Sequence, residues 1–274
     1  MQNLTIALIQ TIQFWEDKAA NYQHLESQHL NQIEPGAADL VLLPEMFNTG
    51  FTMNVKEMYE DMNGEAIEWL HSWAEKLDCQ IGGSLIIKAD NQYYNRFVIV
   101  SPEGILNYYD KRHLFRMAEE NDYFTAGKRR VIHQIKGWKI LLQVCYDLRF
   151  PVFSRNRTIE GQTEYDLVAY IANWPAKRSM VWKNLLQARA IENQAFCIGL
   201  NRVGEDGNGI AYSGDAMVID PWGNVSKPIA ENEEDMEIIT LDYGVLKGIK
   251  SSFPAYLDAE SNIQFGESII TTSE

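Results

Sequence analysis

The sequence contains few cysteines, and no two of them form a recognisable pair. The 274 residues include three, Cys79, Cys145 and Cys197, which are widely spaced and lie outside any Cys-x-x-Cys motif. An odd number at such spacings argues against a disulfide scaffold and against a cysteine zinc site. A reducing, cytoplasmic environment suits such a chain best.

Basic residues and long hydrophobic runs are also scarce. Lys and Arg number 24 against 38 Asp and Glu, which gives a net charge of −14. This balance argues against nucleic acid or an anionic membrane as partner, although local cations could still hold a small anionic substrate. The first ten residues have no basic region, and their apolar run is too short for a signal or membrane segment. We therefore expect a first strand there.

Linkers and phosphate-binding motifs are missing as well. No Pro-, Ser- or Gly-rich stretch divides the chain, whose length allows one large α/β domain or two ordinary ones. There is no Gly-rich phosphate loop and no attached ATP-binding domain, which argues against an ammonia-supplying module of a synthetase. From Gly244 onward, scattered Phe253, Tyr256, Leu257 and Phe265 predict an extended tail rather than a helix.

What is present is an alternation of strand-like and helix-like segments. A helix is expected from an N-cap at Asp17 to about Ile33, a second over Gly64 to Leu77, and a third from Ser179 through Asn193. The third should bury Val181, Leu185, Ala188 and Ile191. Apolar runs of strand length, bounded by turn residues, occur at 4–10, 39–45, 80–87, 97–106, 139–145, 166–172, 196–203 and 238–242.

Two segments read as antiparallel hairpins with a similar turn. One spans 97–106 around a Pro-x-Gly turn, and the other spans 217–225. One hairpin in each half suggests a weak internal duplication in which each half supplies one sheet. The pattern predicts an α/β fold of two packed sheets flanked by helices.

Cys145 ends a buried strand and is followed by a polar turn and Pro151. A thiol on a rigid strand, presented at a loop, is displayed as a nucleophile would be. Taken alone, it is more simply a small core residue, as most free cysteines are. Cys197 lies inside a strand and is expected to be structural.

Two further candidates lie at strand ends. Glu45 follows the apolar run at 39–43 and Pro44, and its apolar neighbours favour a desolvated carboxylate that could act as a general base. Lys111 lies in an irregular, aromatic-rich stretch after the first hairpin. The simpler interpretation of both is a solvated surface charge.

Four motifs resemble those of one family, the nitrilase superfamily of carbon–nitrogen hydrolases. They are Leu-Pro-Glu at 43–45, Tyr-Asp-Lys-Arg-His-Leu-Phe at 109–115, Val-Cys-Tyr-Asp-Leu-Arg-Phe-Pro at 144–151, and Asn-Trp-Pro at 173–175. Each is weak alone, but their order and spacing together are specific. The resemblance covers nearly the whole chain, so we expect a single domain over 1–274 with the tail from about 244.

The resemblance implies a fold and a set of catalytic residues. The fold is a four-layer α-β-β-α sandwich that forms a homodimer through its outer helices. The Glu-Lys-Cys triad falls on Glu45, Lys111 and Cys145, and the supporting glutamate falls on Glu120, with Glu119 adjacent to it. These residues supply what amide hydrolysis by a thiol requires, with the backbone N–H of Tyr146 as a second oxyanion donor. No metal or organic cofactor is needed.

The substrate class is predicted from fewer residues. The sequences His-Leu-Phe-Arg-Met at 113–117 and Arg-Phe-Pro-Val-Phe-Ser-Arg at 149–155 look like the bacterial omega-amidase branch, which acts on 2-oxoglutaramate or 2-oxosuccinamate. Arg149 could bind the far carboxylate, or it could pair with Asp147. Trp174 could line the pocket or only cover the core.

Other functions stay open at this level. The same triad permits a nitrilase or an N-carbamoyl amino acid hydrolase, and a non-catalytic interaction protein is the alternative from another class. A Cys-His mechanism would need a histidine near Cys145. His113 follows Lys111 too closely to replace it easily, whereas His133 stays possible.

Overall fold

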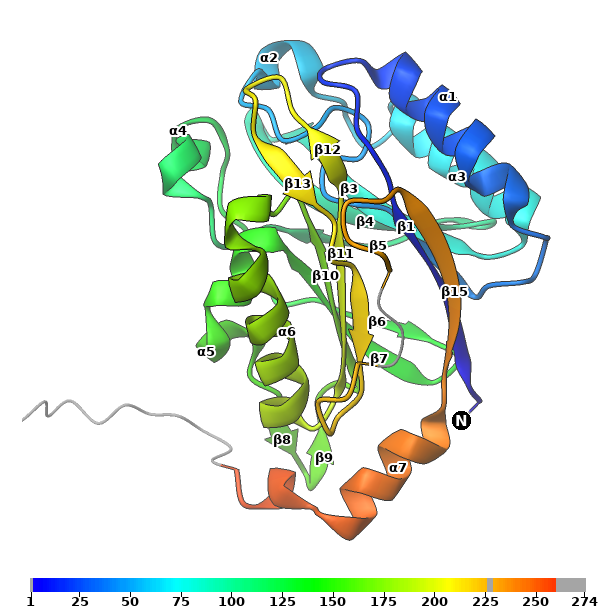
Figure 1. Ribbon diagram of the computed structural model, residues 1–274, viewed down its shortest axis with the longest axis vertical. Helices are drawn as coiled ribbons and strands as arrows, with labels where there is room; N and C mark the ends of the chain where they lie inside the picture. Colours follow the sequence, from blue (N-terminus) through cyan, green and yellow to red (C-terminus); the bar gives the residue numbers. More distant parts are fainter. Residues whose placement is uncertain (1, 226–228, 260–274) are drawn as a thin grey trace, which may run out of the picture.

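Two β-sheets packed face to face, with helices on both outer sides, form the molecule (Figure 1). The computed structural model describes residues 2–225 and 229–259. The first sheet has the order β15-β1-β2-β3-β4-β5 and the second the order β14-β11-β10-β7-β6. The predicted α-β-β-α sandwich is therefore confirmed.

The strands of the first sheet are β1 (Leu4–Gln10), β2 (Leu40–Leu42), β3 (Gln80–Ala89), β4 (Gln92–Ser101), β5 (Gly104–Asp110) and β15 (Asp235–Leu241). Those of the second are β6 (Ile132–Ile135), β7 (Trp138–Val144), β10 (Leu167–Ala172), β11 (Phe196–Asn201) and β14 (Met217–Ile219). Two small pairs lie outside the sheets, formed by β8 (Thr158–Ile159), β9 (Gln162–Thr163), β12 (Val203–Glu205) and β13 (Ala211–Ser213).

Among the described residues, four helices have ten residues or more and three have only four. They are α1 (Lys18–Gln28), α2 (Val55–Met58), α3 (Glu65–Leu77), α4 (Glu120–Tyr123), α5 (Pro151–Ser154), α6 (Ser179–Asn193) and α7 (Tyr243–Ser252). Single 3₁₀ turns occur at η1 (Leu30–Gln32), η2 (Arg116–Ala118), η3 (Cys145–Arg149), η4 (Ala176–Arg178) and η5 (Ala255–Leu257). None of the described helices combines the length and the apolar character needed to cross a membrane.

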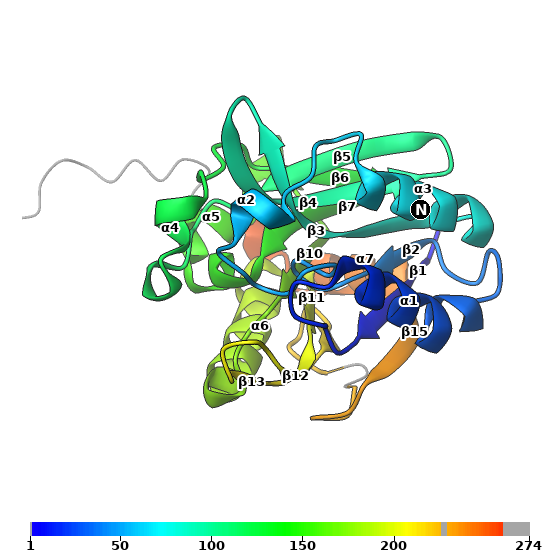
Figure 2. The same cartoon turned by 90° about the horizontal axis from the view of Figure 1, so that it is seen from above.

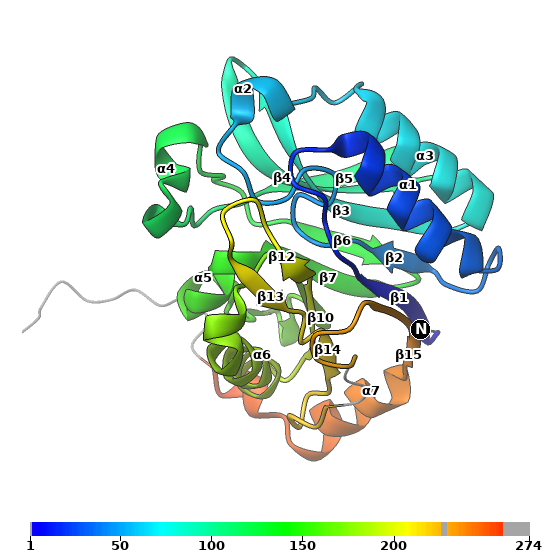
Figure 3. The same cartoon turned by 45° about the horizontal axis from the view of Figure 1, so that its top comes forward.

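The inner strands β1 and β2 of the first sheet are apolar on both faces, as strands covered on both sides are. Alternate side chains of β1 point to opposite faces of the sheet. Ile6 and Leu8 face the second sheet, whereas Ala7 and Ile9 pack under the helices. Helices α1 and α3 lie side by side over that outer face in both views (Figures 1 and 3). Continuous apolar runs in the sequence therefore correspond to strands buried on two sides.

Helix α6 covers the outer face of the second sheet at very close range. A Cβ at Gly199 of β11 would lie 2.2 Å from Leu186 and 2.8 Å from Trp182, so only glycine allows this approach. Trp182, Leu186 and Ala190 join the same core as the inner strands. Helices therefore cover the outer faces of both sheets, which Figure 2 shows from above.

Several predicted boundaries are confirmed and some details are wrong. The Asp17 side chain caps α1, accepting from the backbone N–H of Ala20, but the helix ends at Gln28 and η1 completes the segment. Ser179 is the first residue of α6 and not its cap. The buried face of α6 is shifted by one position, and Ile191 is half exposed. A shift of one residue corresponds to a rotation of about 100° around the helix axis. Because polar and apolar residues are mixed around α6, its sequence did not indicate which face is buried.

The two hairpins form, but one strand of the second half joins the sheet of the first half. Strands β4 and β5 pair antiparallel around the predicted turn, and Ile219 bridges Val225 in the second hairpin. Strand β15, from the end of the chain, pairs with β1 and so joins the sheet of the first half. The expectation that each half supplies one whole sheet is therefore wrong.

The segment after Gly244 also differs from its prediction. Tyr243–Ser252 forms helix α7, capped by the Asp242 side chain, with Leu246 and Ile249 buried. Lys250 donates to Asp166 at 2.9 Å, which ties α7 to the start of β10. A core contact and an ion pair thus order a segment whose apolar residues looked too sparse. Phe265 lies outside the described residues.

Candidate active site

Four strand ends converge on one point between the sheets. Strands β2 and β5 run in the same direction in the first sheet, and their following residues include Glu45 and Lys111. Strands β7 and β10 run parallel in the second sheet and lead into Cys145 and Asn173. Because the carboxyl ends of such strands meet at one edge, residues far apart in sequence come together there.

Lys111 lies at the centre of this cluster. Its Nζ is 2.9 Å from Oε1 of Glu45 and 2.9 Å from both carboxylate oxygens of Glu120. Only 1% of Lys111 is exposed to solvent. Burial alone would lower the pKa of Lys111, but the charges of Glu120 and Glu45 outweigh it, so the pKa is raised and the ammonium stays charged.

Glu120 contacts Lys111, whereas its neighbour Glu119 does not. Glu119 is exposed and adopts the left-handed conformation that ends η2, with φ 58°. Glu120 begins α4, is fully buried and accepts the backbone N–H of Phe115 at 2.5 Å. Burial raises the pKa of the Glu120 carboxyl, against the opposing effect of Lys111.

Glu45 is held by a dense set of hydrogen bonds. Its Oε2 accepts the backbone N–H of Asn173 at 2.8 Å, and its backbone carbonyl accepts from the side chains of Asn173 and Gln13 at 2.8 and 3.0 Å. Asn95 donates to Oε1 of Glu45 at 2.7 Å and to Glu120 at 3.3 Å. The carboxylate therefore has little freedom to turn away from Lys111.

Asn95 was not identified from the sequence. It lies within β4 beside Arg96, in a strand that also contains Gln92 and Ser101, so polarity alone did not distinguish it. An asparagine buried on a strand between two apolar layers needs partners for its amide, and this was the available signal. Its Nδ2 bridges the two carboxylates that also bind Lys111.

Cys145 starts a tight turn in a strained conformation. Its φ is +46°, a value that residues other than Gly, Asn and Asp rarely adopt. The side chain of Asp147 stabilises the turn by accepting from the N–H of Val144 at 3.1 Å and from Tyr109 at 2.8 Å. The Cys145 Sγ lies 3.8 Å from the carbonyl oxygen of Asn173.

The environment of Cys145 favours the neutral thiol over the thiolate. Burial raises its pKa well above the ordinary value, the charge of Glu45 raises it further, and Lys111 acts in the opposite direction. A thiol in this setting keeps its proton until a nearby base removes it during attack.

Neither histidine considered from the sequence replaces this arrangement. His133 lies on β6 and bonds Gln80 of the first sheet at 2.7 Å, away from the cluster. His113 binds Asp147 through Nδ1 at 2.7 Å and stacks on Phe150. Both are structural contacts, so a Cys-His pair is not formed.

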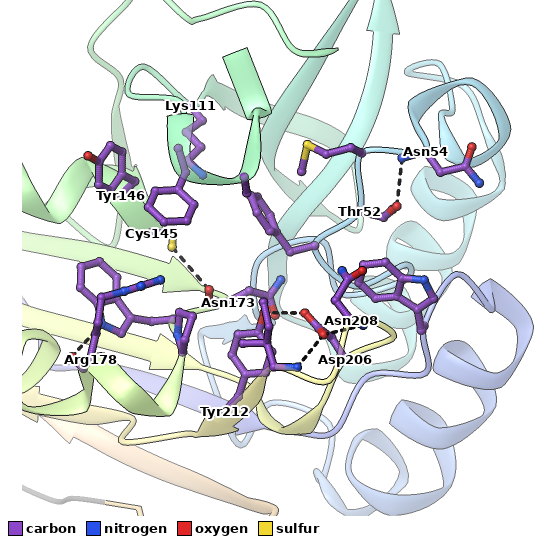
Figure 4. A pocket seen from close by; sticks show the side chains of 18 of the residues that line it. Thr52, Asn54, Lys111, Cys145, Tyr146, Asn173, Arg178, Asp206, Asn208 and Tyr212 are labelled. Carbon is purple, nitrogen blue, oxygen red and sulfur yellow. Dashed lines mark hydrogen bonds between the residues drawn. The ribbon is translucent and has the colours of Figure 1, made fainter. Parts of the chain in front are cut away.

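A cavity of about 410 Å³ opens over Cys145 and Lys111 (Figure 4). Its wall combines aromatic rings, including Trp15, Phe115, Trp174 and Tyr212, with a few polar groups. Trp15 and Tyr212, as well as Asp206, which accepts from the Tyr212 hydroxyl at 2.9 Å, were missed from the sequence because their segments show no motif. This composition suits a small, polar organic ligand.

Two arginines, Arg149 and Arg178, line the cavity. Within the described part of the chain neither forms an ion pair, and their guanidinium groups lie over the rings of Trp174 and Phe115 at 5.3 and 5.2 Å. The alternative pairing of Arg149 with Asp147 is wrong, because Tyr109, His113 and Val144 occupy that carboxylate. Both cations are therefore available to an anion in the cavity.

Trp174 combines the two roles considered for it. It is buried against Trp182, at 5.3 Å between ring centroids, and its Nε1 donates to the carbonyl of Arg178. The same side chain lines the cavity beside Arg149. It thus supports the wall that carries both arginines.

The chain belongs to the carbon–nitrogen hydrolase family. The family model named carbon-nitrogen hydrolase matches residues 5–250. The crystal structure of XC1258 from Xanthomonas campestris, described as a CN-hydrolase superfamily protein with an arsenic adduct in the active site, superposes with a TM-score of 0.92 at 41% identity. That match covers 96% of this chain and 99% of the other.

Relatives with a described activity are similar over most of their length. The omega-amidase YafV of Yersinia enterocolitica is 43% identical over 260 residues, covering 95% of this chain and 98% of the relative. The 2-oxoglutaramate amidase of Bacillus subtilis is 32% identical over 251 residues, covering 90% and 91%. The predicted family and the enzyme class, a carbon–nitrogen hydrolase, are confirmed.

Proposed function

We propose that this protein is an omega-amidase, which hydrolyses the terminal amide of a 2-oxo dicarboxylate monoamide such as 2-oxoglutaramate to the acid and ammonia. The observation that carries the proposal is the buried Glu45, Lys111 and Cys145 cluster below a cavity lined by two arginines that form no ion pair with any described residue. The similarity to omega-amidase YafV and to 2-oxoglutaramate amidase supports the same substrate class.

The first half of the reaction forms a thioester. Glu45 takes the proton of the Cys145 thiol as the sulfur attacks the amide carbonyl, so no free thiolate accumulates beside Glu45 and Glu120. Lys111 and the backbone N–H of Tyr146 stabilise the oxyanion of the tetrahedral intermediate. Glu45 then gives its proton to the amide nitrogen, the carbon–nitrogen bond breaks, and ammonia leaves.

The second half returns the enzyme to its starting state. Glu45 removes a proton from a water molecule that attacks the thioester carbonyl. The oxyanion forms again near Lys111, the carbon–sulfur bond breaks, and the proton on Glu45 returns to the sulfur. One carboxylate thus acts as base and acid in turn, which requires the fixed orientation that Asn173 and Asn95 provide.

Glu120 and Asn95 position the catalytic groups rather than touch the reacting atoms. Glu120 holds the Lys111 ammonium through both of its oxygens and keeps it charged. Asn95 donates to the oxygen of Glu45 that also accepts from Lys111. Without these contacts the ammonium would be less well aligned with the oxyanion.

Substrate recognition is assigned to the aromatic and cationic wall. Arg149 would bind the carboxylate at the far end of the substrate through its planar fork, and Trp174 would hold the guanidinium by stacking. Arg178 lies on the same wall and can share that carboxylate. The overall charge of −14 would repel an anion at long range, so the local cations must supply the attraction.

A substrate panel tests the proposal. The purified protein, without ATP, should release ammonia from 2-oxoglutaramate and 2-oxosuccinamate, and much more slowly from nitriles and N-carbamoyl amino acids. Preference for a nitrile or a carbamoyl compound would replace the omega-amidase with that alternative. No ammonia from any compound would support a non-catalytic interaction protein.

We further infer that the protein is a cytoplasmic homodimer. Helix α6 carries large apolar side chains that are exposed in the single chain, with Met180 at 72% and Ile191 at 50%. Trp222 and Phe253 stack beside Ile191 and are also exposed. The group of Ile191, Trp222 and Phe253, at the end of an outer helix, suits a second copy of the chain.

A further inference from the structure

Three possible metal ligands meet outside the catalytic cluster. Among the described residues, His24, His29 and Glu234 form a group whose ligand atoms all lie within 4.8 Å of one another. His24 is on α1, His29 follows that helix, and Glu234 precedes β15. The three segments are brought together because β1 and β15 are neighbours in the first sheet (Figure 1).

Both imidazoles point the same nitrogen at one carboxylate oxygen. The Nε2 atoms of His24 and His29 lie 2.7 and 3.0 Å from Oε1 of Glu234. The rings are nearly perpendicular, with centroids 6.1 Å apart at 78°, and Phe14 packs against His24 at 5.4 Å. Ligand atoms bound to one zinc ion at about 2.0–2.2 Å lie roughly 3.3 Å from each other, so only small shifts would be needed.

The same oxygen is crowded by further donors. Oε1 of Glu234 also accepts from the hydroxyl of Thr11 at 2.5 Å and from the backbone N–H of Ile12 at 3.1 Å. A carboxylate oxygen offers about two lone pairs, so four donors cannot all be satisfied by it. A cation between the ring nitrogens and the carboxylate would lessen this crowding, because each Nε2 would then offer a lone pair to the cation instead of a proton to Oε1.

We propose that His24, His29 and Glu234 bind one Zn²⁺ ion, with water as the remaining ligand. Two imidazole nitrogens and a carboxylate oxygen form a donor set that zinc prefers. The side chains of His24 and Glu234 are partly exposed, so water can reach the site, while Thr11 and Ile12 orient the carboxylate.

Zinc here would act as a structural clamp. It would hold α1, the turn after α1 and the segment before β15 close to residues 11–13. Gln13 in this segment donates to the backbone carbonyl of Glu45 at 3.0 Å, so the zinc ion would also stabilise the position of the catalytic carboxylate. The ion lies outside the reaction, and its binding should therefore be independent of the proposed amidase activity.

Titration of Zn²⁺ into the Cys145→Ala variant tests the proposal, because this background removes the thiol of the active site as a competing ligand. Calorimetry should show one equivalent bound per chain, and zinc should raise the melting temperature. The His24→Gln/His29→Gln pair in the same background should weaken binding at least about 100-fold and abolish the thermal shift.

Controls separate this result from weak surface binding. His71→Gln, a half-exposed histidine that pairs with Glu75, should leave zinc binding unchanged. Glu234→Gln provides a second test if the double variant does not fold by circular dichroism. Equal zinc binding with and without the histidines would overturn the proposal. So would the absence of binding at about 100 μM zinc, a concentration far above that needed by a built His₂Glu site.

Discussion

At the scale of single residues, the site depends on a thiol that is buried, strained and surrounded by charge. Cys145 has a positive φ and a raised pKa, and it is 8% exposed. Cys79 and Cys197 are also buried, and burial raises the pKa of Cys79 to about 12. What distinguishes Cys145 is its neighbours, Glu45 and Lys111, and not its accessibility.

Replacing the nucleophile should abolish activity without unfolding the protein. Cys145→Ala and Cys145→Ser should retain the native circular dichroism spectrum and release ammonia at less than about 1% of the wild-type rate, because no thioester forms. Cys79→Ala and Cys197→Ala are the matched controls and should lose stability but keep the chemistry. Activity of the Cys145 variants above that level would rule out a covalent mechanism.

Glu45 and Lys111 should behave as one catalytic unit. Glu45→Gln removes the base, and Lys111→Ala removes the cation that stabilises the oxyanion, so each should lower kcat by several orders of magnitude. The double variant should be little worse than either single one, since the groups share a hydrogen bond and a step. Losses that simply add in log kcat would contradict these roles.

Arg149 should control which amides are good substrates. Arg149→Lys keeps the charge but loses the bidentate fork, so kcat/KM for 2-oxoglutaramate should fall by about 10- to 1000-fold, equal to roughly 1.5–4 kcal/mol. A neutral short-chain amide should change much less.

The matched control for this variant is Arg157→Lys, at a surface arginine that pairs with Glu164. It should affect neither substrate. Equal losses on acidic and neutral amides in Arg149→Lys, together with a lower melting temperature, would instead assign Arg149 to the scaffold.

At the scale of elements, the two sheets are joined by a buried polar contact as well as by apolar packing. His133 of β6 donates its Nε2–H to Oε1 of Gln80 on β3, 2.7 Å away, and is 3% exposed. Burial lowers the pKa of His133 from 6.5 to about 4. In the native protein this imidazole is therefore neutral over most of the useful pH range.

This contact predicts a pH dependence of stability. His133 binds a proton near pH 6.5 in the unfolded chain and only near pH 4 in the folded chain. The free energy of unfolding is therefore highest above pH 6.5 and decreases as the pH falls from 6.5 to 4. Over that window the loss is about 3 kcal/mol. His133→Gln, which cannot titrate, should show a shallower decrease in urea-unfolding free energy from pH 7 to 4. An identical slope in both proteins would contradict this.

At the scale of the whole molecule, the exposed apolar side chains of Ile191, Trp222 and Phe253 predict self-association. Sedimentation equilibrium should give twice the 31.4 kDa of one chain. Ile191→Glu on α6 should shift the equilibrium toward the monomer, because a charge would be buried in the interface. Ile105→Glu, at a comparably exposed position on β5, is the control and should remain dimeric.

A wild-type protein that sediments as a monomer would contradict the proposed homodimer. The contacts of Lys111 with Glu45 and Glu120 form within one chain, so we expect them to persist in a monomer. Zinc occupancy at His24, His29 and Glu234 should likewise not depend on dimer formation, because all three ligands belong to one chain.

Much of this protein could be predicted from local patterns. The strands β1, β3, β7 and β10 read as apolar runs because both of their faces are buried, and α3 reads as a helix because its apolar residues repeat at helical spacing. Cys145, Glu45 and Lys111 were identifiable because each follows a strand within a motif. A family resemblance then linked motifs that local chemistry alone could not.

Other features depend on contacts between distant segments and left little trace in the sequence. Asn95 became part of the site only when β4 placed it between Glu45 and Glu120. Helix α7 formed because Asp166 and the core stabilise it, despite its sparse apolar residues.

The identity of the functional residues could be predicted from the sequence, whereas their proximity in space could not. The sequence by itself determined which side chains can act as base, cation and nucleophile, because that depends on chemical type and on position at a strand end. Only the tertiary structure decided that β15 returns to β1, that Arg149 is free of Asp147, and that His24, His29 and Glu234 meet. Such meetings depend on how two sheets pack, which no local pattern encodes.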